Sequence, residues 1–172
     1  MRRIVVVGSQ GSGKTHLSLA LGRKLGLPVI HLDALYWQPG WKPSDRTDFR
    51  ARVAEAISGD GWIVDGSYSG LCLDLTVARA DLFIALERSR WLCMWRVLQR
   101  SAFQRRGQRT DLPEGCPEQF DWDLVGQTWR WPTERRPQIE AERLQYGAHA
   151  PVVHLRTDRE IAAFVEASSP AT

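Results

Sequence analysis

Residues 1–15 read MRRIVVVGSQGSGKT, and this stretch decides the fold. Residues 4–7 form a short β-branched run that ends at a glycine, which is typical of a parallel strand buried on both faces. Residues 8–15, GSQGSGKT, match the phosphate-loop pattern G-x-x-x-x-G-K-[ST] at every fixed position. Apolar residues then recur with helical spacing over 15–25. Strand, loop and helix therefore follow one another in the order that a phosphate-binding loop requires.

This loop has the chemistry needed to hold a triphosphate. Gly8, Gly11 and Gly13 let the backbone approach a ligand, so that N–H groups and the positive end of the next helix converge on phosphate oxygens. Lys14 supplies a cation for the β- and γ-phosphates, and Thr15 supplies a hydroxyl for Mg²⁺. The expected nucleotide-binding residues here are Gly8, Gly11, Ser12, Gly13, Lys14, Thr15 and His16.

Length and composition are those of an ordinary globular chain. With 172 residues, one domain spanning 1–172 is expected. No apolar run approaches the ~18 residues of a membrane span, so we expect no membrane partner. The three cysteines are widely spaced, which favours neither a disulfide framework nor a zinc site. This cysteine usage indicates a reduced, cytoplasmic compartment.

Two further strands are expected to end near an acid. Residues 29–32 form the second strand, followed by Asp33, and residues 61–66 form the third, which ends at Asp65 and a glycine. A strand–helix–strand unit of about 30 residues has parallel strands, and ligands bind beyond their carboxyl ends. We expect Asp65 and Thr15 to serve the Mg²⁺ site. Asp33 either acts on the acceptor or caps a turn, and the acceptor role is favoured.

The segment between these strands is aromatic. Residues 34–43, ALYWQPGWKP, are expected to form a loop. Its rings either stack on a planar acceptor or cover the edge of the sheet, and covering is favoured for each of Tyr36, Trp37 and Trp41. Residues 45–57 are expected to form a helix, and residues 67–70 a polar loop near the acceptor.

A basic block follows the fourth strand, which is expected over 80–86. Residues 88–109 contain seven arginines and no acid, which suits a local site for a polyanion such as ATP better than a broad nucleic-acid surface. We expect a helix over 89–106, with Arg96 and Arg100 on one face beside the nucleotide. The residues expected on its buried side are Trp91, Trp95, Leu98 and Ala102.

Beyond this helix, residues 108–117 contain two prolines and a glycine and cannot form regular structure. We interpret residues 103–117 as a lid that closes over the phosphates, the alternative being a solvated basic helix end. In the lid, arginine forks would hold phosphate oxygens and stabilise the charge on the transferring group. The catalytic lid residues expected are Arg105, Arg106 and Arg109. Helices over 118–131, 137–146 and 158–166 and a fifth strand over 151–155 complete the α/β chain.

Several of these segments also carry a resemblance: GSQGSGKT (8–15), LPVIHLDALYW (27–37), GWIVDGSYS (61–69), RADLFIALERSRWLCMWRVLQR (79–100) and EGCPEQFD (114–121). In this order and spacing the chain resembles the adenylate-kinase-like P-loop kinases, most closely the topology modulation (FlaR-like) group. The resemblance implies a three-layer P-loop sandwich with a five-stranded parallel sheet in the order 2-3-1-4-5. It also implies ATP and Mg²⁺ as cofactors and an arginine-bearing lid.

One departure from the adenylate kinases concerns the acceptor. In those enzymes the third strand continues into Asp-Gly-Phe-Pro-Arg, and the arginine grips the acceptor phosphate. Residues 65–69 read DGSYS instead, while residues 31–36, HLDALY, are similar to the Asp-x-x-Tyr segment of nucleoside-type kinases, whose acid accepts the hydroxyl proton. We therefore expect an ATP-dependent kinase for a small nucleoside-like or other hydroxyl-bearing acceptor.

Two alternatives remain for the function. The first is a nucleoside monophosphate kinase, in which Arg79 or Arg135 replaces the missing arginine. The second is a nucleotide-dependent regulator associated with DNA topology, for which the basic block 88–109 is the support. Binding of nucleic acid is thus open as a partner interaction, but it is not favoured.

Overall fold

A computed structural model describes residues 2–103 and 122–169, excluding the side chains of 101–103, and places the phosphate-loop strand in the middle of a parallel sheet. Its elements are β1 (Arg3–Gly8), α1 (Lys14–Leu25), β2 (Val29–His31), α2 (Leu32–Tyr36), β3 (Trp37–Gln38), β4 (Lys42–Pro43), α3 (Arg46–Ala56), β5 (Trp62–Asp65), α4 (Leu73–Val77), β6 (Leu82–Leu86), α5 (Arg90–Phe103), α6 (Trp122–Arg130), α7 (Arg135–Tyr146), β7 (Val152–Leu155) and α8 (Asp158–Ala167).

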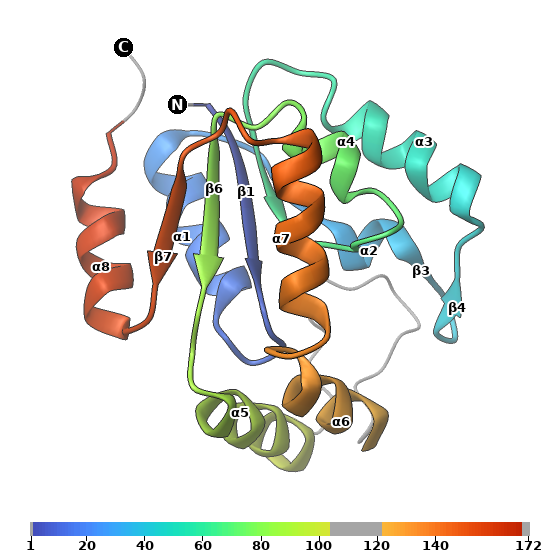
Figure 1. The fold of residues 1–172 in the computed structure, drawn as a ribbon, viewed down its shortest axis with the longest axis vertical. Coiled ribbons are helices and arrows are strands. Elements are labelled where there is room, and N and C mark those ends of the chain that lie inside the picture. The colour runs from blue at the N-terminus through green and yellow to red at the C-terminus, as the bar shows by residue number, and fades with distance from the viewer. Residues whose placement is uncertain (1, 104–121, 170–172) are drawn as a thin grey trace.

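The main sheet has five strands in the order β2-β5-β1-β6-β7, and every neighbouring pair is parallel. Counted along the chain, these strands stand in the order 2-3-1-4-5, which confirms the expected topology. Because all five strands run the same way, their carboxyl ends share one edge of the sheet. Helices α5 and α6 lie beyond that edge (Figure 1).

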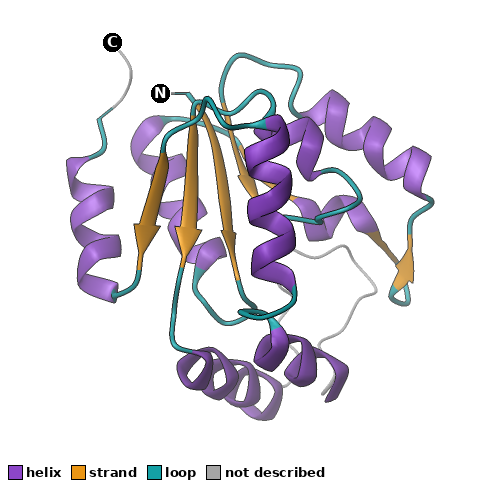
Figure 2. Ribbon diagram, in the orientation of Figure 1, coloured by secondary structure: helices purple, strands orange, loops and turns teal. Residues whose placement is uncertain are grey.

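Helices cover both faces of the sheet, as Figure 2 shows. Successive residues of β1 alternate between two cores. Ile4 and Val6 pack on the side of α1 and α8, while Val5 and Val7 pack on the side of α3, α4 and α7. Strands buried on both faces read as continuous apolar runs, which explains the sequence of residues 4–7. The three-layer prediction is confirmed.

The aromatic segment after β2 is more ordered than expected. Residues 34–43 were expected to form a loop, but the chain forms the short helix α2 and then the β3–β4 hairpin. The packing of the Tyr36 ring explains this order. It lies edge-on to the ring of Phe49 in α3, with 5.0 Å between the ring centroids, and 4.7 Å separates its centroid from that of Tyr68. Asp33 consequently lies in the first turn of α2, since β2 ends at His31.

The prediction for the buried side of α5 was wrong for its two tryptophans, while Leu98 is partly buried and the side chain of Ala102 lies outside the described residues. Trp91 and Trp95 are 67% and 59% exposed, whereas Cys93 and Val97 are buried. The reason is that α5 lies beyond the sheet edge, so its contacts are with the phosphate loop and α6 rather than with a sheet face. Within residues 2–103 and 122–169, no helix is both long enough and apolar enough to cross a membrane.

Asp81 joins the start of β6 to the start of β1. Its Oδ2 accepts hydrogen bonds from the backbone N–H groups of Arg2 and Arg3 at 2.8 and 3.0 Å, and its Oδ1 lies 2.7 Å from Arg3 Nη2. Burial acts to raise the pKa of Asp81, but the hydrogen bonds from Arg3 and Arg2 outweigh it and lower the pKa to about 2. This contact therefore stabilises the fold above the ordinary pKa of 3.8, and the stabilisation is lost as the pH falls towards 2.

We expect Asp81→Asn to lower the free energy of unfolding by about 1 kcal/mol at pH 7, since the carboxylate is partly exposed. The difference from wild type should shrink at pH 3, because at that pH the unfolded carboxylate has largely bound a proton while the folded one has not, so part of the stabilisation is already lost. Urea unfolding at the two pH values measures it, with Asp60→Asn, an exposed carboxylate, as the control. An equal loss at both pH values would contradict the assignment.

Candidate active site

The phosphate loop connects β1 to α1 at the carboxyl edge of the sheet. Gly11 and Gly13 have φ angles of 74° and 95°, in the left-handed region that favours glycine. A side chain at Gly11 would collide with the backbone carbonyl of Cys93 on α5, so this turn requires glycine. Helix α1 begins at Gly13 with no side-chain cap and no acid in its first turn. Its first N–H groups are thus left for an anion.

Three polar side chains of the loop strengthen this interpretation. Ser9 and Ser12 are buried, and in the described part of the structure neither hydroxyl has a hydrogen-bond partner. The side-chain oxygen of Gln10 is likewise buried without a partner there. Buried polar atoms are rarely left unpaired in folded proteins. A group of three beside an uncapped helix start indicates a place built for a polar ligand.

The structure brings one predicted arginine to the loop. Arg96 Nη1 lies 3.7 Å from the position that a Cβ on Gly13 would take, and its Nη2 lies 3.5 Å from Asp158 Oδ2. Arg100 is partly buried one turn further along α5, and His16 is exposed on the first turn of α1. The predicted lid 103–117 lies outside the described residues except for the backbone of its first position. The three predicted catalytic arginines also lie outside them: Arg105, Arg106 and Arg109.

Asp65 ends β5 on the same edge and is 5% exposed. Its Oδ2 lies 3.0 Å from His31 Nδ1, and its Oδ1 is buried with no partner among the described residues. Mg²⁺ is usually bound through few carboxylates and several waters. A carboxylate with one oxygen held by a hydrogen bond and one oxygen without a partner suits such a hydration shell. Together with the Thr15 hydroxyl at the start of α1, these residues fit the metal expected from the sequence.

Asp33 is paired with a tyrosine from the loop after β5. The hydroxyl of Tyr68 donates a hydrogen bond to Asp33 Oδ1 at 2.6 Å. Burial and the neighbouring Asp33 carboxylate raise the pKa of Tyr68 well above its ordinary value, so the phenol stays protonated and remains a donor. Tyr68 adopts a positive φ of 41°, which is unusual for a residue other than glycine. The hydrogen bond to Asp33 thus comes from a residue in a sparsely populated backbone conformation.

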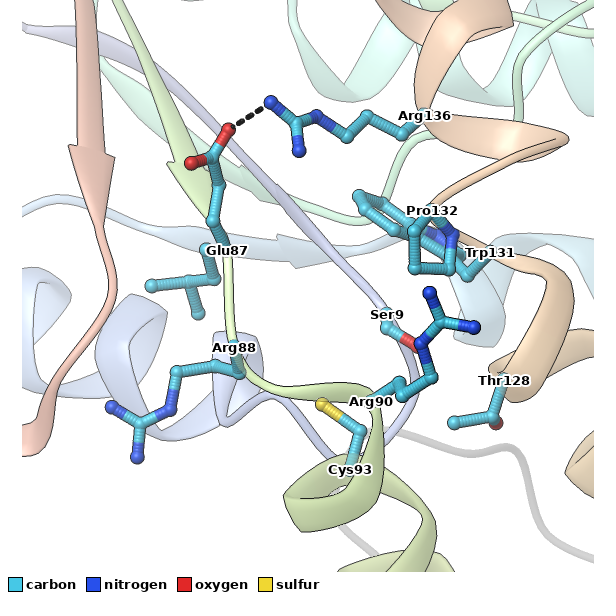
Figure 3. Close-up of a pocket in the computed structure, with 10 residues that line it drawn as sticks. Ser9, Glu87, Arg88, Arg90, Cys93, Thr128, Trp131, Pro132 and Arg136 are labelled. Carbon is cyan, nitrogen blue, oxygen red and sulfur yellow. Dashed lines mark ion pairs between the residues drawn. The ribbon is translucent and has the colours of Figure 1, made fainter.

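A cavity of about 170 Å³ adjoins the phosphate loop on the side of β6. Figure 3 shows Ser9, Arg90 and Arg136 around it, with Glu87 at its upper margin. Arg88 points away from the other lining residues in this view. Its guanidinium instead donates to Asp158 Oδ1 at 2.6 Å. The cavity wall is therefore mixed: Arg90 and Arg136 supply positive charge, while Leu86, Trp131 and Pro132 are apolar.

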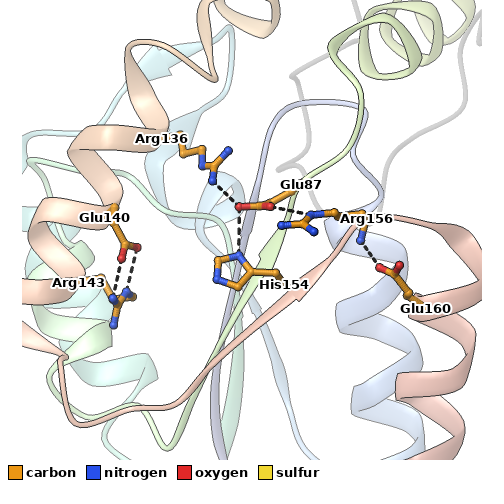
Figure 4. A network of polar contacts seen from close by, with 7 residues as sticks. All are labelled: Glu87, Arg136, Glu140, Arg143, His154, Arg156 and Glu160. Atoms are coloured by element: carbon orange, nitrogen blue, oxygen red, sulfur yellow. Dashed lines mark hydrogen bonds and ion pairs between the residues drawn. The ribbon is translucent and has the colours of Figure 1, made fainter.

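Glu87 is the centre of a charged network at the carboxyl end of β6 (Figure 4). Its Oε1 lies 2.6 Å from Arg136 Nη2 and 3.1 Å from His154 Nδ1, and its Oε2 lies 3.1 Å from Arg156 Nε. Burial acts to raise the pKa of Glu87, but the hydrogen bond from Arg156 and the charges of Arg136 and His154 lower it below its ordinary range. Both carboxylate oxygens are thus satisfied, so this network is structural support.

Three further residues belong to this edge although no sequence pattern pointed to them: His31, Ser9 and Glu87. His31 lies two positions before Asp33, and its place opposite Asp65 follows only from the β2–β5 pairing. Ser9 occupies a variable position of the loop pattern. Glu87 follows a buried strand, as Asp33 and Asp65 do, and that position was the available signal. Tyr68 lies in the loop expected near the acceptor.

Solved structures with the same arrangement include several kinases. Shikimate kinase from Acinetobacter baumannii, in complex with shikimate, is 14% identical, with 96% of this chain and 89% of that chain covered and a TM-score of 0.62. A gluconokinase from Sinorhizobium meliloti 1021 is 19% identical, with 96% and 87% covered and a TM-score of 0.56. A sugar kinase from Janibacter sp. HTCC2649 is 16% identical, with 96% and 91% covered and a TM-score of 0.53.

No family model matches the chain. No curated protein matches it in sequence either. Because the sequence identities to the three kinases are below 20%, the similarity shows a shared fold only. It extends over almost the whole chain and includes the sheet order and the helices on both faces. The chain therefore has the α/β fold of the P-loop kinases.

Proposed function

We propose that this protein, acting as a single domain, is a kinase that transfers the γ-phosphoryl group of MgATP to a hydroxyl group of a small acceptor. The observation that supports this most directly is the shared edge: an uncapped phosphate loop, Asp65 with one open oxygen, and Asp33 held by Tyr68 all lie at the carboxyl ends of neighbouring strands. Kinase chemistry needs a triphosphate site, a metal site and an acceptor base within one such edge.

On the nucleotide side, the loop N–H groups and Lys14 bind the triphosphate. Thr15 and Asp65 hold Mg²⁺ and its waters, and the bound ion neutralises charge on the β- and γ-phosphate oxygens. Arg96, already beside the loop, and Arg100 lend further positive charge, as do the arginines at 105, 106 and 109. The resemblance to the topology modulation group remains a prediction from the sequence.

On the acceptor side, Asp33 accepts the hydroxyl proton as the nucleophile attacks. The Tyr68 hydroxyl binds Oδ1 of Asp33 and fixes the rotation of the carboxylate. In this proposal the second oxygen, Oδ2, accepts the proton. Ser9 and Arg90 border the cavity beside the phosphate loop, where they offer further hydrogen-bond donors. The acceptor class we favour is a nucleoside-like or other hydroxyl-bearing molecule.

A coupled assay of ADP release tests this function. Purified protein with MgATP is assayed against a panel of nucleosides, sugars and hydroxy acids, and separately against AMP, CMP, GMP, UMP and dTMP. Turnover that depends on a hydroxyl acceptor supports the proposal, and turnover confined to the monophosphates supports the monophosphate-kinase alternative. Duplex DNA binding that weakens steeply with salt, without acceptor-dependent turnover, would support the regulatory alternative instead.

Removing the Tyr68 hydroxyl should slow the reaction without changing nucleotide binding. We expect Tyr68→Phe to lower kcat about 10-fold, or ~1.4 kcal/mol in the activation free energy, because Asp33 loses the donor that orients it. KM for ATP should stay within a factor of two. Steady-state kinetics measure both values, with Tyr146→Phe as a control on exposed α7. An unchanged kcat would contradict this role. So would a rise in KM for ATP as large as the fall in kcat.

A further inference from the structure

We propose that His31 is a positioning residue that orients Asp65 towards the Mg²⁺ that accompanies the nucleotide. The inference rests on the proposed function, since the metal is part of that site. It arises from a contact between two strands rather than from any motif. His31 does not belong to the phosphate loop and was not expected at the site from the sequence.

The sheet places the two side chains together. His31 is the last residue of β2 and Asp65 the last residue of β5, and the parallel register makes them direct partners. Partners in a parallel pair project from the same face of the sheet. Nδ1 of His31 and Oδ2 of Asp65 are 3.0 Å apart, and the exposed fractions of the two side chains are 13% and 4%. The contact is therefore shielded from water and held between the edge strand β2 and its neighbour β5.

The protons follow from the chemistry of the pair. An ionised carboxylate can only accept hydrogen bonds, so Nδ1 of His31 carries the proton that lies between the two groups. The ring thereby fixes the rotation of the Asp65 carboxylate and partly offsets the cost of burying its charge. His31 Nδ1 contacts Oδ2 of Asp65, while Oδ1 has no partner in the described part of the structure. The histidine thus anchors one of the two oxygens of this acid.

The open oxygen distinguishes this pair from an ordinary structural contact. Glu87 and His154 form a similar carboxylate–histidine pair on the same sheet, but there both oxygens have partners. In Asp65 the second oxygen, Oδ1, is buried and has no partner in the described part of the structure. A buried carboxylate oxygen without a donor is costly unless a ligand supplies one. A water of the Mg²⁺ shell supplies such a donor, and histidine–carboxylate contacts of this kind commonly tune metal sites.

Calorimetric titration of the whole protein with a non-hydrolysable ATP analogue tests the inference without relying on activity. Each variant is titrated once with Mg²⁺ and once with EDTA. Wild type should bind more tightly with Mg²⁺. We expect His31→Leu to weaken binding with Mg²⁺ about 10-fold, the usual effect of losing such a supporting contact, while binding in EDTA stays within a factor of two.

The conservative variants separate positioning from mere packing. Asparagine places an N–H donor close to the position of Nδ1, so His31→Asn should recover most of the Mg²⁺-dependent affinity, whereas His31→Gln should not. These two variants decide the question if His31→Leu does not fold. The matched control is His149→Leu, which removes a histidine that contacts the Ala80 carbonyl at the opposite end of the sheet. That variant should bind as wild type does under both conditions.

Two results would overturn the inference. One is a His31→Leu protein that binds as tightly as wild type with Mg²⁺. The other is an equal loss of affinity with Mg²⁺ and with EDTA, which would mean that His31 supports the nucleotide pocket in general. A wild-type protein whose nucleotide affinity ignores Mg²⁺ would instead overturn the proposed function, and this inference with it.

Discussion

Lys14→Ala should lower kcat for phosphoryl transfer by about 10²- to 10³-fold, the usual cost of removing one preorganised charge from a transition state. Lys14 is the first residue of α1, beside the N–H groups that would hold the triphosphate. As charge spreads over the oxygens of the transferring group, this cation gains interaction energy. The loss should therefore fall on kcat more than on KM for ATP.

The fold should survive this change. Lys14 is partly exposed, and no ion pair links it to another described residue, so the free energy of unfolding should move by less than about 0.5 kcal/mol. Lys42→Ala removes the same charge from the exposed β3–β4 hairpin and serves as the control. If Lys14→Ala transferred phosphate at the wild-type rate with the acceptor present, the phosphate loop would have no catalytic part and the kinase proposal would be wrong.

Asp33→Asn should reduce acceptor-dependent turnover by about 10²- to 10⁴-fold, the range for a general base. Asparagine keeps an oxygen that accepts the Tyr68 hydrogen bond, so the local structure is preserved while the basic group is lost. Binding of MgATP should be unchanged, because the acid lies in the first turn of α2 and not on the phosphate loop.

This experiment also separates two roles for Asp33. If the carboxylate merely stabilised the first turn of α2, the variant would lose thermal stability and keep its turnover per folded molecule. If it is the acceptor base, the variant melts normally and loses turnover, while slow ATP hydrolysis without acceptor continues. Melting temperature and single-turnover rate, measured on the same preparation, distinguish the outcomes, with Asp60→Asn as an exposed control.

Much of the fold could be predicted from the sequence because its signals are local. Residues 4–7 and 82–86 are apolar at every position, and only a strand buried on both faces needs that pattern. Glycine after α1 and the acid before α3 mark helix ends whose caps are now visible: Gly26 is left-handed, and Asp45 accepts from Thr47 N–H at 2.8 Å. The sheet order came from the resemblance and not from these signals.

The errors share one physical cause, namely contacts between segments far apart in the chain. Helical spacing alone predicted Trp91 and Trp95 as the buried side of α5, but the helix meets a loop instead of a sheet, and Cys93 faces inward. The spacing of polar and apolar residues cannot tell which neighbour a helix will have. In the same way, the packing of Tyr36 against Phe49 and Tyr68 ordered a segment whose own sequence indicated a loop.

The residues of the candidate site also fall into two groups: those that a local sequence pattern predicts and those that only distant contacts bring together. Gly8 to Thr15 were identified because the phosphate loop is contiguous, and Asp33 and Asp65 because each stands next to a strand end. The pairs His31–Asp65 and Tyr68–Asp33 join residues 34 and 35 positions apart, so no short pattern contains them. A sequence therefore indicates which groups can react, whereas the structure indicates what holds them.

The close packing of Gly11 against the backbone of Cys93 links the phosphate loop directly to α5. Helix α5 packs against the phosphate loop at this point. The indoles of Trp91 and Trp95 stand on the solvent side of the same helix. We therefore expect binding of a nucleotide at the loop to change the fluorescence of these two tryptophans.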